Sequence, residues 1–241
     1  MPGWQALHET YEDKGFSVVT VALDTDPGQA RPWIEAASPT HRSLIDPSHI
    51  TDELFGFNNV PMAVWIDESG TLVRPAESAS IESSPLRGAP IPDDLPAPVR
   101  ELIGEARQIP DIAAQYRAAL VNWIEHGASS PYAMLPDEVI EASLPRHQSH
   151  SEAAANFELG VELLGRHGKQ AAQPYWRAAH ALDPDNWTYK RQAWTMETTV
   201  EGEPSDLFQG PTDVYEGSWL GDVKAMGGGV NYITKPDFVA D

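Results

Sequence analysis

The sequence predicts an α/β fold over residues 1–74, followed by a mainly α-helical region. Two observations predict it. Residues 16–23, FSVVTVAL, are dense in β-branched residues and lack regular polar alternation, which is typical of a strand covered on both faces. The segments on either side carry apolar residues at helical spacing. Strands that alternate with helices in this way indicate an α/β layer fold.

The expected elements follow in order along the chain. Trp4, Leu7 and Tyr11 recur at helical spacing, and Gly15 ends this first helix after Lys14. The strand at 16–23 leads through a loop at 24–27 into a helix that extends to residue 37. Residues 43–45 form a brief strand, and residues 50–55 form a short helix.

A β-hairpin is expected at residues 57–73, FNNVPMAVWIDESGTLV. Residues 62–66 are the first strand, and residues 71–73 are the returning strand. The turn between them contains Gly70, which adopts a positive φ without steric cost. Pro61 stands at the start of the first strand, where its missing N–H does little harm.

Composition limits the possible partners. The chain has 241 residues, 41% of them apolar, which is enough for a packed core. Its 16 basic and 36 acidic residues give a net charge of −20, and there is no Lys/Arg cluster. We therefore expect no nucleic-acid or anionic-membrane partner, and a basic partner is favoured.

No apolar run approaches the roughly 18 residues that cross a bilayer. The opening residues MPGWQALHE show neither a basic stretch nor an apolar one. We expect a soluble, cytoplasmic protein. The chain contains no cysteine, which excludes a disulfide, a thiolate nucleophile or a Cys-ligated metal within residues 1–241.

Few other residues suggest a site, and no metal or other cofactor is expected. His147 and His150 lie close together in RHQSH, but a solvated loop is favoured over a metal site. Asp24 and Asp26 follow a strand end, where α/β sites often lie, although loop capping is the favoured role. The tryptophans of the C-terminal half are expected in the core: Trp176, Trp187 and Trp194.

Residues 1–74 resemble a thioredoxin-like domain of the TlpA/ResA/redoxin branch. The segment around Val60-Pro61 resembles the cis-proline hairpin of those proteins, which implies a cis bond here. GFSVVTVALDTD, residues 15–26, is similar to their second strand, and SLIDPSHITDELFGFNNVP, residues 43–61, is similar to the segment that leads into the hairpin. The three segments occur in the order and spacing of that family.

The chain departs from the family at its start. There, a first strand ends in a Cys-x-x-Cys-type motif at the N-terminus of the first helix, where the helix dipole lowers the thiol pKa. Here the first helix begins at residue 1, so this strand and its motif are missing. The strand is central in such a sheet, between the strand at 16–23 and the hairpin. Its absence leaves inner strand edges unpaired.

One explanation is a truncated sequence. The chain most resembles the group described as ResA-like proteins with a WAxxUGxxC motif, in which U is selenocysteine. Met1-Pro2 then corresponds to the Met-Pro that follows the motif, and the strand and motif are expected upstream of Met1. The competing interpretation is a redox-dead homologue that is completed by a strand from another chain.

The resemblance implies a thiol- or selenol-disulfide oxidoreductase or peroxidase. Its partners would be a protein disulfide or peroxide substrate and a thiol reductant. Catalytic residues are expected upstream of Met1 and none within the chain, so residues 1–241 alone are not expected to be active. Val60 and Pro61 are the expected substrate-binding residues. The alternative is a redox-dead thioredoxin-fold module that binds a protein partner through its helical region.

The rest of the chain divides into three parts. Residues 75–98 are Pro-rich and are expected to be a linker. Residues 99–200 are expected to be helical, with breaks at Pro110 and Gly168, and residues 151–185 resemble one tetratricopeptide repeat. A single repeat cannot bury its own face, so the pair should pack on its neighbours. Residues 201–241 are expected to be an irregular acidic tail.

Overall fold

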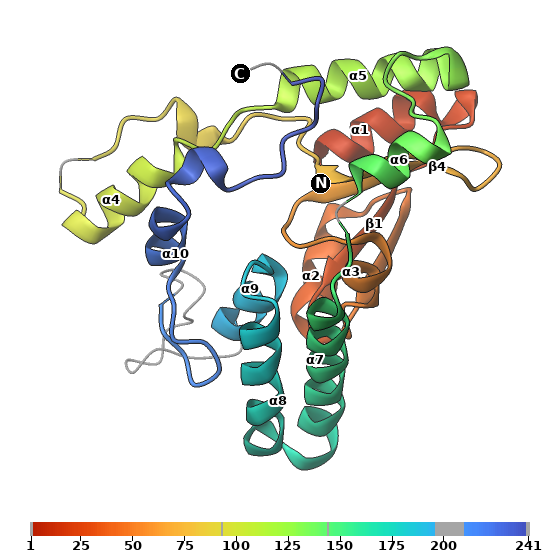
Figure 1. The fold of residues 1–241 in the computed structure, drawn as a ribbon. Coiled ribbons are helices and arrows are strands. Elements are labelled where there is room, and N and C mark those ends of the chain that lie inside the picture. Colours follow the sequence, from red (N-terminus) through yellow and green to blue (C-terminus); the bar gives the residue numbers. More distant parts are fainter. Residues whose placement is uncertain (1, 93, 144, 196–209, 240–241) are drawn as a thin grey trace.

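Two separate sheets of two strands each form the β part of the chain (Figure 1). They are seen in a computed structural model that describes residues 2–92, 94–143, 145–195 and 210–239. Helices lie on both sides of the sheets and continue into the C-terminal half. The protein is therefore a mixed α/β chain, as the alternation of strands and helices predicts.

The first sheet is parallel. Helix α1 (Pro2–Tyr11) precedes it, and strands β1 (Val19–Leu23) and β2 (Arg42–Asp46) pair from one end to the other. Helix α2 (Pro27–Ala37) makes the crossover that two parallel strands require. Gly15 ends the first helical segment at φ 84°, as expected.

Strand β1 differs from the expected one in length and in burial. It begins at Val19 instead of Phe16, and none of its residues is fully buried. Val19 is 54% exposed. The strand is therefore less buried than predicted, and its edge away from β2 borders a cavity rather than another described strand.

The second sheet is the expected hairpin. Helix α3 (Ile50–Phe55) leads into β3 (Met62–Ile66), which pairs with the antiparallel strand β4 (Leu72–Ser78). Strand β4 extends past the expected end at residue 73 and includes Pro75. The register is irregular around the pair Trp65–Arg74, and such an irregularity accommodates a residue without an N–H donor.

The expected linker at 75–98 therefore begins later than predicted. Its first residues belong to β4, and Ala79 and Ile81 are buried in the core. The remainder of the segment holds one short 3-10 turn at Pro85–Arg87. The buried side chains of Ala79 and Ile81 hold the residues just after β4 against the hydrophobic core.

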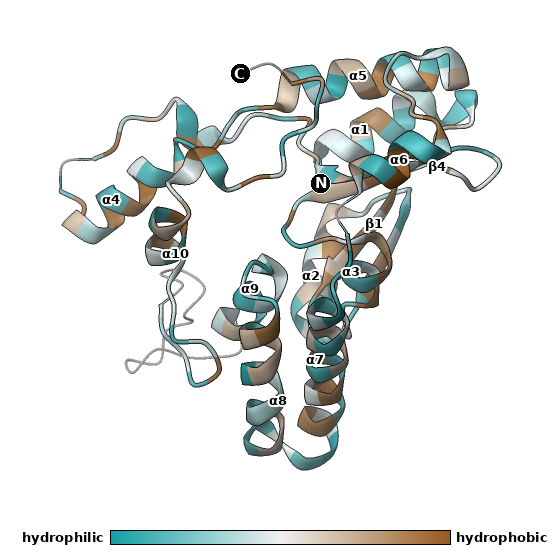
Figure 2. Cartoon of the chain, in the orientation of Figure 1, coloured by the Kyte–Doolittle hydropathy of each residue, from teal (hydrophilic) through white to brown (hydrophobic). Residues whose placement is uncertain are grey.

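In the part of residues 99–200 that the structure describes, six α-helices follow where helices are expected. They are α4 (Ala97–Ala106), α5 (Ala113–His126), α6 (Pro136–Ala142), α7 (Gln148–His167), α8 (Lys169–Leu182) and α9 (Trp187–Thr195). Helices α7 and α8 lie side by side and project from the rest, joined at Gly168 as predicted. Figure 2 shows hydrophilic and hydrophobic residues mixed along α5 and α7, as expected for helices with one buried face.

The C-terminal segment is more ordered than an irregular tail. Residues 201–209 and 240–241 lie outside the described residues, but 210–239 contain α10 (Trp219–Ala225) and a 3-10 turn at Gly229–Asn231. This segment also buries six apolar side chains: Val214, Trp219, Val223, Tyr232, Pro236 and Val239. Apolar residues scattered through a Gly/Pro-rich sequence thus pack into the core.

One core joins the hairpin to the helices. It gathers residues of α1, β3, β4 and α5 together with Val239 near the C-terminus. At its centre the indole Nε1–H of Trp65 donates to the hydroxyl of Tyr116 over 2.8 Å. Both side chains are buried, so each polar group depends on the other for its hydrogen bond.

Replacing Tyr116 by Phe should lower the free energy of unfolding by about 1–3 kcal/mol, because the buried indole donor of Trp65 loses its acceptor. Urea denaturation followed by fluorescence measures the change. Tyr175→Phe on α8 is the matched control, since no hydrogen bond of its hydroxyl to another described residue is seen. Equal effects of the two substitutions would contradict the importance of the Trp65–Tyr116 hydrogen bond.

The stability of the helical region should depend on pH through His180. This residue is 7% exposed and stacks on Tyr215 with ring centroids 4.6 Å apart. Burial, with a smaller contribution from Lys190, lowers the pKa of His180 from 6.5 to about 4. The unfolded chain binds a proton at this histidine near pH 6.5, whereas the folded chain does not, so stability is lost as pH falls from 6.5 toward 4.

His180→Gln should remove this loss, which amounts to up to about 3 kcal/mol between the two pH values. The free energy of unfolding at a series of pH values measures the difference between variant and wild type. His167→Gln, at an exposed histidine of α7, should leave the wild-type dependence unchanged. A wild-type pH dependence in H180Q would contradict the assignment.

Candidate functional site

A cavity of about 990 Å³ separates the two sheets. All residues of β3 line it, and so do all residues of β1 except Ala22. No residue of β2 is among its lining residues. The cavity therefore lies between the edge of β1 that faces away from β2 and the edge of β3 that faces away from β4.

These two strand edges have no strand partner among the described residues. Strand β1 pairs with β2 alone, and β3 pairs with β4 alone. Half of the backbone N–H and C=O groups of a strand point toward each edge, and such groups need hydrogen-bond partners when they are not in water. The cavity is thus bordered on two sides by unused backbone donors and acceptors.

Helices close the cavity above and below the sheet. On one side lie Trp4 of α1 and Tyr116, Leu120 and Trp123 of α5. On the other side lie Phe55 of α3 and the residues near it. This is the layered arrangement of an α/β sheet, with a space at the position of one strand that no described residue fills.

The predicted substrate-binding residues Val60 and Pro61 lie at the rim of this cavity. Both line it and both are exposed, Val60 to 39%. The peptide bond between them is cis, which confirms that expectation. The fold thus brings the two residues to the mouth of the cavity.

The C-terminal half of the chain holds the Val60-Pro61 loop in place. The backbone N–H of Trp187 donates to the carbonyl of Asn58 over 2.7 Å. The buried side chain of Asn59 donates to the carbonyl of Tyr232 over 3.1 Å and accepts from the N–H of Val60 over 2.8 Å. The sequence offers no signal for these contacts, because Asn59 and Tyr232 are 173 residues apart.

A buried polar cluster near the loop joins α3 to α9. His49 Nδ1 lies 3.5 Å from Asp52 Oδ2, and the Thr188 hydroxyl donates to that carboxylate and lies 3.3 Å from the same imidazole nitrogen. Burial raises the pKa of Asp52, although its hydrogen bond from His49 acts in the opposite direction. All three residues are 3% exposed, so the cluster is a buried connection between the two helices.

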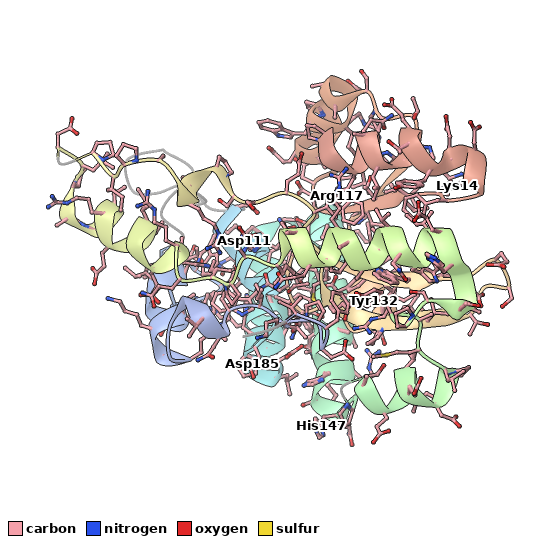
Figure 3. The ribbon with its side chains drawn as sticks, turned by 90° about the horizontal axis from the view of Figure 1, so that it is seen from above. Lys14, Asp111, Arg117, Tyr132, His147 and Asp185 are labelled. Carbon is pink, nitrogen blue, oxygen red and sulfur yellow. The ribbon has the colours of Figure 1, made fainter. Side chains whose placement is uncertain are left out.

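The other candidate residues have structural positions. Asp26 Oδ1 accepts from Gly28 N over 2.8 Å at the start of α2, and Asp24 Oδ1 accepts from Asp26 N over 3.1 Å, which confirms loop capping. His150 lies inside α7 rather than in a loop, and His147 precedes that helix at the edge of the molecule (Figure 3). No group of three or more potential metal ligands occurs among the described residues.

The three tryptophans expected in the core are all buried there: Trp176, Trp187 and Trp194.

The lining of the cavity suits an extended segment better than a reacting small molecule. No histidine lines it, and the chain has no cysteine. Apolar side chains dominate the walls, whereas the strand edges present backbone hydrogen-bonding groups. The site can therefore accept a β-strand on both edges and cover it with helices on both faces.

Comparison with known proteins gives no relative for this chain: no protein family, curated protein or solved structure matches it. Within the described residues, no helix has both the length and the apolar character needed to cross a membrane.

Replacing Asn59 by Ala should release the C-terminal segment from the loop. The substitution removes a buried side chain with three hydrogen bonds, and we expect a loss of about 1–3 kcal/mol in unfolding free energy. Hydrogen exchange should also accelerate at residues 229–234. Asn58→Ala is the control, because the contact of Asn58 with Trp187 uses its backbone carbonyl. Unchanged exchange in N59A would contradict the anchoring role.

Proposed function

We propose that residues 1–241 belong to a thioredoxin-like oxidoreductase of the ResA/redoxin type. In this proposal the central strand and its Cys-x-x-Cys-type or selenocysteine-containing motif precede Met1. The single observation that supports it most is the 990 Å³ cavity between β1 and β3. It lies where the resemblance requires the missing strand, and it presents the open strand edges with which that strand would pair.

The position of α1 supports the proposal. Trp4 in the first turn of α1 lines the cavity, as does Glu82, whose side chain contacts Gly3. In Figure 1 the N-terminus lies beside the sheets. A strand that fills the cavity could therefore continue into α1 through a short connection. The reactive motif would then stand at the N-terminus of α1, where the helix dipole favours a thiolate or selenolate.

The proposed reaction is an exchange between this nucleophile and a disulfide. The thiolate or selenolate attacks one sulfur of the substrate, the S–S bond breaks, and the departing sulfur leaves as a thiolate that takes a proton from water. The resolving cysteine of the motif then displaces the second substrate sulfur. The substrate gains two electrons, the motif becomes oxidised, and an external thiol reductant restores it. With a peroxide, the same nucleophile would attack one oxygen and break the O–O bond, which releases water or an alcohol. The sulfenic or selenenic acid formed would then condense with the resolving cysteine and release water.

Val60 and Pro61 would contribute binding rather than chemistry. They lie exposed at the rim of the cavity, beside the place where the motif would emerge. The Val60 carbonyl and N–H could pair with an extended substrate backbone, as a strand edge does. The N–H, however, already donates to Asn59, so in this proposal the carbonyl is the group available to substrate.

A protein extended at its N-terminus tests the proposal. The upstream reading frame should encode an apolar strand followed by a Cys- or U-containing motif, and the extended protein is made with Cys in place of any U. We expect disulfide reductase or peroxidase activity that is absent from residues 1–241 alone. The matched control carries Ser at the motif cysteines, which keeps the strand but removes the thiolate.

Two results would contradict the proposal that this protein is an oxidoreductase. One is an upstream frame that encodes no strand and no motif. The other is inactivity of the extended protein although its thermal stability rises, which would mean that the strand fills the cavity without chemistry. The second result, together with a strand contributed by another chain, would favour a redox-dead binding module.

A further inference from the structure

A second, smaller cavity lies beside the Val60-Pro61 loop. Its volume is about 290 Å³, and it is formed between the carboxyl end of β1 and helix α9. Val21, Leu23 and Val60 supply an apolar wall, and these three residues also line the larger cavity. The carboxyl ends of strands are where α/β proteins place ligand sites. This cavity is large enough for a small organic molecule.

Arg191 supplies the positive charge of this cavity. One of its terminal nitrogens donates to the hydroxyl of Tyr232, but its Nε–H is buried and has no hydrogen-bond partner among the described residues. No described carboxylate forms an ion pair with it, although acidic residues outnumber basic ones by 36 to 16. Arg74 and Arg146, by contrast, both pair with carboxylates. Among the described residues, Arg191 is therefore a partly buried cation without a counterion, and an anion from solution would offset the cost of burying its charge.

The neighbouring polar side chains are already engaged. Gln192 accepts from the N–H of Thr25 over 2.9 Å and donates to Thr195 over 2.9 Å. The Thr188 hydroxyl belongs to the buried cluster with Asp52. Among the side chains of this cavity, hydrogen-bonding capacity for a ligand is therefore concentrated on the guanidinium of Arg191.

We propose that this cavity binds the carboxylate of a small organic monoanion. Arg191 would hold the carboxylate through the N–H donors of its terminal nitrogens, since its Nε–H is closed to solvent. The apolar part of the molecule would lie along Val21, Leu23 and Val60. Arg191 is the one cationic side chain that lines the cavity, and the carboxyl group of Asp24 lies in the same wall. This balance of charge disfavours a dianion such as phosphate.

This proposal does not depend on the redox motif, so it can be tested on residues 1–241 directly. Butyrate is the probe, because it combines one carboxylate with a short apolar chain. Binding is measured by isothermal calorimetry and by saturation-transfer NMR, with 1-butanol and n-butylamine as neutral and cationic analogues. Butyrate should bind at least about tenfold more tightly than either analogue, since a hydrogen bond between two charged groups is stronger than one between neutral groups.

Arg191→Gln should weaken butyrate binding by about tenfold or more, and Arg191→Lys should restore part of it, because Lys keeps the charge but lacks the planar fork. Arg117→Gln on α5 is the matched control, at an exposed arginine of another helix (Figure 3). Unchanged affinity in R191Q would overturn the proposal. So would equal binding of butyrate and 1-butanol by the unaltered chain, or tighter binding of inorganic phosphate. The comparison of probes remains valid even if R191Q fails to fold.

Discussion

The need of every strand edge for hydrogen-bond partners is the constraint on which this structure depends. Strands β1 and β3 face each other across a cavity, and each has one edge without a partner strand among the described residues. Helices α1 and α5 close one side of this space, and the end of α3 borders the other. A sheet position that is covered on both faces and bordered by two open edges is a site shaped for a strand.

The outer edge of the hairpin, on β4, forms hydrogen bonds with other segments of the chain. There the N–H of Ser78 donates to the carbonyl of Thr234, and the N–H of Met134 donates to the carbonyl of Val73. Irregular segments thus cover part of the outer edge of β4, which protects it from pairing with another molecule. The contrast makes the open inner edge of β3 a specific feature of the cavity rather than a general property of the sheet.

Local patterns in the sequence predicted most of the elements, because helix spacing, β-branched runs and turn residues act over a few positions. The hairpin, the crossover helix α2, the capping by Asp26 and the break at Gly168 follow from such signals. The packing of residues 210–239 did not, because it depends on scattered apolar side chains and distant partners. The small cavity was also missed, since Arg191 belongs to a helix whose sequence gives no indication that it meets β1.

The ion pair between Arg74 and Asp237 has a consequence for synthesis of the chain. These residues lie 163 positions apart, and their side chains meet over 2.6 Å. At a translation rate of about 5–20 residues per second, roughly 8–30 seconds separate their emergence from the ribosome. During that interval Glu77, at 2.7 Å, is the one of these two carboxylates that can pair with Arg74. A hairpin that forms before residue 237 is synthesised therefore lacks its contact with Asp237 until that residue arrives.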